Sequence, residues 1–279
     1  MLRRLADLDR RWIFLVVALA VVAPLVWPLR LPIEPSAPTR GVYAAVEALP
    51  PGALVCMSFD YGPGTKVECH PMALAALRHA FRKEAKVVAI ALWPEGALFA
   101  REALRQVGAE MDRAEGLDYV NLGYKSGGEV VLRGIADDFR NIYSTDLAGR
   151  RVDELPLMSR VRGWKSFDLV CDWSMGNPGL LQHVRVVATQ YGRPLVAGVT
   201  AVTAPEAYPF LNSGQVQGLL SGLRGAAEYE VMVGHPGTAT RGMDAQSVVH
   251  FVIAGFIVVA NLLYFAERRE RRRRQERNR

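Results

Sequence analysis

The chain has 279 residues, half of them hydrophobic, and a formal net charge of +6. This length suits one large domain or two small ones, and the composition excludes a disordered, collagen-like or disulfide-dense chain. The charge lies at the ends: residues 1–12 sum to +2 and residues 267–279 to +5, which leaves −1 for the 254 residues between them. A folded nucleic-acid-binding surface is therefore not expected, and nucleic acid is not a predicted partner.

Residues 12–29 form the first predicted transmembrane helix. The stretch carries no charge, begins at Trp12 and has Trp27 near its other end. Its eighteen residues are close to the minimum needed to cross a bilayer. Pro24 is expected to bend this helix without abolishing it. A cleaved signal peptide is the alternative, although the apolar stretch is long for one and a good cleavage site is lacking.

Residues 247–266 form the second predicted transmembrane helix. No charge occurs from 248 to 265, and the stretch closes with Tyr264 and Phe265 before an arginine-rich tail, residues 267–279. His250 and Asn261 are its strongly polar side chains, and we expect them near a headgroup layer or facing a partner helix.

The distribution of arginine predicts the orientation of both helices. Lys and Arg favour the cytoplasmic side, and the two outer flanks are much richer in Arg than the inner ones. We therefore expect residues 1–11 and 267–279 in the cytoplasm, and the region between the helices on the extracytoplasmic side of the plasma membrane. The tail is expected to contact anionic lipid headgroups, with RNA or ribosome binding as the alternative.

The central region consists of a proline-rich tether, residues 30–50, and a predicted domain, residues 51–240. In the domain, short continuous apolar runs alternate with segments of helical periodicity. This alternation is typical of an α/β fold with a mainly parallel, doubly wound (Rossmann-like) sheet covered on both faces. The expected strands are 53–59, 86–93, 118–124, 166–173 and 194–202, and the expected helices are 70–83, 97–111, 128–139, 180–191 and 213–230.

A weak internal repeat concerns the first and fourth strands. Leu54-Val55-Cys56 leads to Asp60 and a Gly-Pro turn, and Leu169-Val170-Cys171 leads to Asp172 and a second Gly-Pro turn. Two βαβ halves that meet at the centre of the sheet would explain these two similar segments. Alternatively, common strand and turn residues recur there by chance.

Polar residues at the predicted strand ends form the candidate ligand-binding site. The carboxyl ends of parallel strands meet at one edge of the sheet and form the crevice there. Asp60 and Asp172 would be neighbours if their strands are adjacent, and could then hold a cation or give one carboxylate a raised pKa. Alternatively, each aspartate caps a turn or a helix. The candidate residues are Asp60, Glu95, Lys125, Asp172 and Thr203.

Glycines recur every fourth residue at Gly214, Gly218 and Gly222, and Ala226 continues the series. On the helix expected over 213–230 they would form one face almost without side chains. Because each glycine weakens a helix by about 1 kcal/mol relative to alanine, such a face needs close packing in return. The packing partner is either the sheet of the same domain or another subunit, and the second possibility makes these residues a candidate association face.

No catalytic or cofactor signature accompanies these features. Neither glycine-rich turn has phosphate-loop spacing, and His79, His183 and His235 lack metal-ligand spacing with one another, so no cofactor or metal is predicted. Cys69 beside His70 resembles a helix start more than a nucleophile and its base.

Two functions of different classes follow from the sequence. The leading hypothesis is a non-catalytic, membrane-anchored subunit that assembles with itself or with other membrane proteins through its α/β domain. The alternative is an extracytoplasmic protein that binds a small ligand or an ion, or a hydrolase, with its site in the strand-end crevice.

Overall fold

The computed structural model describes residues 10–277, without the side chains of 267, 270–272 and 274. Residues 1–9 of the predicted cytoplasmic N-terminus and the last two residues of the predicted tail lie outside the described residues. The chain divides into two compact units, one of residues 33–240 and one of the two terminal segments. Each is described by itself.

The larger unit contains a six-stranded sheet, β3-β2-β1-β4-β5-β6, in which every neighbouring pair is parallel. This strand order is that of a doubly wound Rossmann-like sheet, which confirms the predicted fold class. The chain reverses direction across the sheet between β1 and β4, so the switch point lies at that pair. The strands are β1 (Leu54–Asp60), β2 (Lys86–Ala91), β3 (Tyr119–Tyr124), β4 (Leu169–Ser174), β5 (Leu195–Val199) and β6 (Gly218–Ser221).

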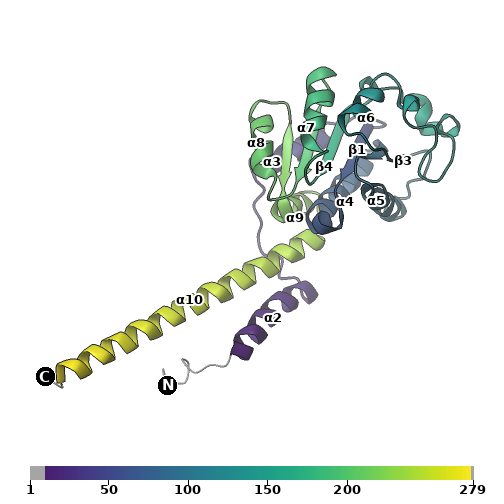
Figure 1. Ribbon diagram of the computed structural model, residues 1–279. Coiled ribbons are helices and arrows are strands. Elements are labelled where there is room, and N and C mark those ends of the chain that lie inside the picture. The colour runs from purple at the N-terminus through teal and green to yellow at the C-terminus, as the bar shows by residue number, and fades with distance from the viewer. Residues whose placement is uncertain (1–9, 278–279) are drawn as a thin grey trace. The chain divides into compact units, whose positions relative to one another are not determined.

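Helices cover both faces of the sheet (Figure 1). One face packs against α3 (Ala37–Glu47), α4 (Lys66–Arg82), α5 (Gly96–Glu110) and α9 (Gly222–Met232). The other packs against α6 (Glu129–Gly134), α7 (Leu180–His183), the π-helix η6 (Val184–Gln190) and α8 (Ala204–Asn212). Because both faces are covered, the strands read as continuous apolar runs. Short 3-10 helices lie at η1 (Pro63–Thr65), η2 (Phe139–Asn141), η3 (Val152–Glu154), η4 (Pro156–Arg160) and η5 (Trp164–Ser166).

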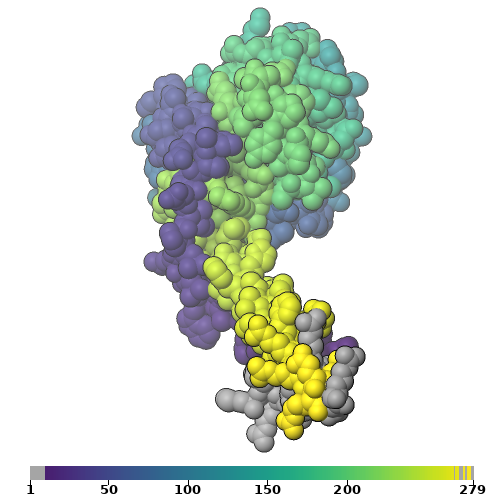
Figure 2. Space-filling model, turned by 90° about the vertical axis from the view of Figure 1, so that its left-hand side faces the viewer, coloured from purple at the N-terminus to yellow at the C-terminus, as the bar shows by residue number. Residues whose placement is uncertain are grey.

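The predicted tether is wrong over most of its length, since α3 occupies residues 37–47. Pro38 lies in the first turn of α3, where the missing N–H is not needed for a helical hydrogen bond. Val42 and Val46 are buried. The helix packs against β6 and α9, and Figure 2 shows its blue-purple surface beside the green surface of the later chain. The folded unit therefore begins at residue 33 and not at 51.

The helix expected over 213–230 is also wrong, because this segment contains a turn, a strand and a shorter helix. Gly214 has a positive φ of 75° in the turn after α8, and Gly218 begins β6. Gly222 begins α9 with a φ of 58°, and Ala226 is buried within that helix. Gly218 packs so closely on α3 that a Cβ there would overlap the backbone of Gly41 and Val42. The glycine spacing therefore reflects a turn, a backbone contact inside the domain and a helix start, not one helical face.

The terminal unit contains two apolar helices, α2 (Arg10–Val26) and the first part of α10 (Thr238–Arg277). Among the described residues, the segment Thr238–Ala266 of α10 is long and apolar enough to cross a membrane, and it is the single segment that meets both criteria. α2 has 17 residues, holds Pro24 inside the helix and ends at Val26, before the predicted end at residue 29. That α2 crosses a membrane stays a prediction.

Candidate functional site at the ends of β1 and β4

Asp60 and Asp172 lie on neighbouring strands and on the same face of the sheet. In the β1–β4 register Ser58 is opposite Asp172, and Asp60 is opposite Ser174. Side chains alternate along a strand, so Asp60 and Asp172 share the face of Cys56 and Val170, which contribute to the core beneath α6, α7 and α8. Both aspartates are completely buried.

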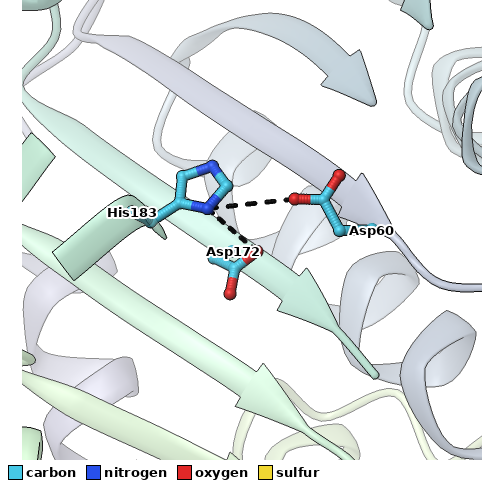
Figure 3. A group of neighbouring side chains, drawn as sticks. All are labelled: Asp60, Asp172 and His183. Atoms are coloured by element: carbon cyan, nitrogen blue, oxygen red, sulfur yellow. Dashed lines mark ion pairs between the residues drawn. The ribbon is translucent and has the colours of Figure 1, made fainter. Parts of the chain in front are cut away.

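His183 joins the two carboxylates from above the sheet. The chain leaves β4 through a Gly-rich turn, and α7 begins after Gly179, which places the fourth residue of the helix, His183, over the strand ends. Its Nδ1 lies 3.5 Å from Asp172 Oδ1 and 3.8 Å from Asp60 Oδ2. Figure 3 shows this nitrogen facing both carboxylates and the other ring nitrogen pointing away from them.

Two serines orient the carboxylates. Ser58 Oγ donates a hydrogen bond of 2.7 Å to Asp60 Oδ2, and Ser174 Oγ donates one of 2.7 Å to Asp172 Oδ2. The backbone N–H of Leu92, just after β2, donates to Asp60 Oδ1 at 2.6 Å. Three carboxylate oxygens are therefore held by donors, while Asp172 Oδ1 and His183 Nε2 have no hydrogen-bond partner among residues 10–277.

Burial changes the proton affinity of all three groups. It raises the pKa of Asp60 to about 7, and the nearby charge of Asp172 adds to the rise. Burial likewise raises the pKa of Asp172 to about 7 and lowers the pKa of His183. The hydrogen bond from Ser174 Oγ opposes this rise in the pKa of Asp172. The two carboxyl groups therefore keep a proton to higher pH than a free aspartate does, and the imidazole stays neutral to lower pH than a free histidine.

A cavity of about 220 Å³ adjoins the cluster at the carboxyl ends of β4 and β5. Ser174 belongs to both, because it lines the cavity and its hydroxyl donates to Asp172. Polar groups from Asn177, Thr203 and Glu206 face apolar groups from α7, β5 and α8. The complete lining is Ser174, Gly176, Asn177, Leu180, Leu181, Val199, Thr203, Glu206, Ala207 and Phe210.

The other sequence-predicted residues do not join the carboxylates. Glu95 lies at the start of α5, where its backbone carbonyl accepts hydrogen bonds from the N–H groups of Leu98 and Phe99. Lys125 Nζ lies over the ring of Tyr143 at 5.5 Å from its centroid. Thr203 lines the cavity and its hydroxyl lies 2.9 Å from that of Thr200.

Cys69 and His70 do not form a nucleophile and base. Cys69 is fully buried, and burial raises the pKa of its thiol, so the thiolate is suppressed. The His70 Nδ1 instead lies 2.8 Å from the hydroxyl of Tyr61. Cys56 and Cys171 are buried free thiols.

His183 is the residue of the cluster that the sequence did not predict as a site residue. Histidine spacing gave no signal because its partners are aspartates on two distant strands. A usable signal was its position four residues after Gly179, at the start of the helix that follows Asp172.

Comparisons with known proteins add no relative: the chain matches no protein-family model, no curated protein and no solved structure.

Proposed function

We propose that this chain is a membrane-anchored binding protein whose α/β domain holds a small ligand in the cavity at the ends of β4 and β5. The cavity is the observation that carries the proposal. It lies beside the switch point of a doubly wound sheet, which is where such folds bind ligands. Its volume of about 220 Å³ is below the roughly 300–1,000 Å³ of drug-sized sites, so the ligand is smaller than a nucleotide.

The lining indicates the chemistry of the ligand. Glu206 is the charged residue of the lining, and Ser174, Asn177 and Thr203 add uncharged hydrogen-bonding groups. Leu180 and Phe210 provide an apolar wall. These groups suit a small amphipathic molecule with an ammonium or hydroxyl group and a short apolar part.

The location belongs to the same proposal. Membrane crossings by the segments 12–29 and 247–266 would hold the domain on the extracytoplasmic side, with both termini in the cytoplasm. The hydropathy and length of the segment Thr238–Ala266 support the second anchor. The arginine-rich tail would lie against anionic headgroups, each nearby charge contributing about 1 kcal/mol.

The association hypothesis has lost one of the observations that motivated it. The bare helical face was one of its three supports, beside the two predicted membrane anchors and the lack of a catalytic signature, and Gly218 instead begins a strand and packs on α3 inside the domain. Binding in the crevice is therefore the better supported of the two functions.

A cavity-blocking variant tests the proposal. A Cβ at Gly176 would enter open space, so Gly176→Phe can fill the cavity without a backbone clash. Gly64→Phe is the matched control, because Gly64 is equally open and lies outside the cavity lining. Short-chain alkylamines, amino alcohols and glycerol are screened against the full chain in mild detergent by saturation-transfer NMR.

We expect at least one probe to bind the wild type and Gly64→Phe but not Gly176→Phe. Glu206→Gln should weaken amines more than alcohols. Binding that persists in Gly176→Phe, or a screen with no binder, would contradict the proposal.

A further inference from the structure

We propose that Asp60, Asp172 and His183 bind a divalent transition-metal cation inside the α/β domain. This inference does not rest on the cavity ligand, because the three proposed metal-binding side chains do not line the cavity; Ser174 is the residue that contacts both sites. The three side chains come from two central strands and the helix that crosses above them (Figure 3).

The donor atoms are already close to a coordination geometry. One potential ligand atom from each residue lies within 4.8 Å of the other two, and the shortest separations are 3.5 and 3.8 Å. Ligands at about 2.0–2.2 Å from one cation lie about 3–3.5 Å apart. Small side-chain rotations would therefore close the site.

The hydrogen-bond pattern leaves one oxygen free for a cation. Ser58 and Leu92 hold Asp60, and Ser174 holds one oxygen of Asp172. Asp172 Oδ1 is completely buried, faces His183 Nδ1, and has no hydrogen-bond donor among residues 10–277. An unpaired buried carboxylate oxygen is costly, and a cation would satisfy it.

Charge and ligand type select the class of cation. Two carboxylates and a neutral imidazole balance a charge of 2+. The mixed nitrogen and oxygen set suits Zn²⁺, Mn²⁺, Fe²⁺ or Co²⁺, whereas Ca²⁺ prefers six to eight oxygens. The serine hydroxyls would act as the hydrogen-bonding groups that fix metal-binding carboxylates.

Binding requires a particular tautomer of His183. Nδ1 faces the carboxylates and also lies 3.1 Å from the carbonyl oxygen of Gly179. To coordinate a cation, Nδ1 must carry no proton, and the ring proton must lie on Nε2. A proton shared by the carboxyl groups must also leave to solvent.

Metal content and stability test the proposal on the full chain, purified in mild detergent without a polyhistidine tag. We expect about one equivalent of a transition metal per chain by plasma mass spectrometry, or uptake of added Zn²⁺ or Mn²⁺ after chelation. The loaded protein should melt at a higher temperature than the chelated one, and Mg²⁺ and Ca²⁺ should have no such effect. A chain that takes up no metal and whose melting is unchanged by all four cations overturns the proposal.

Variants locate the metal. Asp172→Asn and His183→Gln each remove a direct ligand and should weaken binding at least about 100-fold, and Ser174→Ala should weaken it about 10- to 100-fold. Asp168→Asn is the matched control: its carboxylate accepts a hydrogen bond of 2.8 Å from the Leu54 N–H near the start of β4, away from the cluster. Unchanged binding in folded Asp172→Asn protein overturns the assignment.

Cobalt substitution tests the ligand set in the wild type and does not depend on the folding of any variant. Cys56 lies on β1 and on the same face of the sheet as Asp60, and a Cys56 thiolate ligand would produce an intense thiolate-to-cobalt charge-transfer band. We expect visible d–d bands without that band. A thiolate band, or no cobalt spectrum, overturns the proposed site.

Discussion

His70, near the start of α4, is a buried histidine whose titration should control the acid stability of the domain. Its ring lies edge-on to those of Tyr61 and Phe99, which stack on each other with centroids 5.4 Å apart. Tyr61 supplies its one hydrogen bond among the described residues. Burial lowers the pKa of His70 to about 4, with a further lowering from Lys66, against an opposing effect of Glu102. Because the unfolded histidine titrates near 6.5, the unfolded chain binds this proton first as the pH falls.

The stability held by a neutral His70 is therefore fully present above about pH 6.5 and is lost as the pH falls toward 4. His70→Gln keeps a hydrogen-bonding group for Tyr61 but does not titrate. Between pH 8 and 4.5 the wild type should lose about 2–3 kcal/mol more unfolding free energy than His70→Gln. Urea unfolding in detergent, followed by the fluorescence of buried Trp164 and Trp173, measures the difference.

The exposed His235 provides the matched control, since His235→Gln makes the same substitution away from the rings of Tyr61 and Phe99. Identical profiles for the wild type and His70→Gln would show that His70 does not titrate as its burial requires.

Individual site residues could be predicted only where sequence position determined their place in the sheet. Asp60 and Asp172 follow matching apolar runs, and adjacency of those runs brings the two carboxylates together. Glu95 and Lys125 also follow strands, but on β2 and β3, farther from the switch point. The position of the His183 side chain depends on the angle at which α7 crosses β4. Residue type and sequence spacing do not determine that angle.

Among the elements, α3 and β6 form a contact that admits only glycine. A Cβ at Gly218 would overlap the backbone of α3, and a Cβ at Gly41 would overlap the carbonyl oxygen of Gln217. Gly218→Ala should therefore reduce the unfolding free energy by about 1–3 kcal/mol or more, because rigid backbone must move. Gly64→Ala is the control and should be neutral or slightly stabilising, since its Cβ would meet open space.

Urea unfolding measures this effect, and native mass in detergent should be the same for all three proteins. A Gly218→Ala protein of unchanged stability but lower native mass would show instead that this glycine contacts another subunit, and would restore the association hypothesis.

Long apolar runs predicted most elements well, and short glycine-rich ones did not. The five expected strands are all present, because a strand buried on both faces needs a continuous apolar run. β6 has only four residues and begins with glycine, so the sequence pattern of a β-strand is weak there. The glycines at every fourth residue favoured a helix instead. The proline content of residues 32–38 similarly concealed the start of α3, since proline is equally compatible with a tether and a first helical turn.

For the whole molecule, the distribution of charge and hydropathy predicts how the chain meets the membrane. The apolar segment Thr238–Ala266 continues as a helix to Arg277. One continuous helix therefore contains both the candidate membrane span and the arginine-rich residues that follow it, the basic flank. The flank is expected to remain in the cytoplasm because arginine is retained there. If both predicted segments cross the membrane, the N-terminus also lies in the cytoplasm, and the α/β domain between the segments lies on the extracytoplasmic side.

Single engineered cysteines test this arrangement with little background, because Cys56, Cys69 and Cys171 are all buried. Glu154→Cys places a thiol on an exposed position of the domain, and Gln275→Cys places one on the basic flank. A membrane-impermeant maleimide should label Glu154→Cys in intact spheroplasts and Gln275→Cys only in inverted vesicles. Labelling of Gln275→Cys from outside would reverse the orientation. Labelling of the two positions from opposite sides also requires residues 238–266 to cross the bilayer, whereas labelling of both from the same side would leave that segment without a crossing.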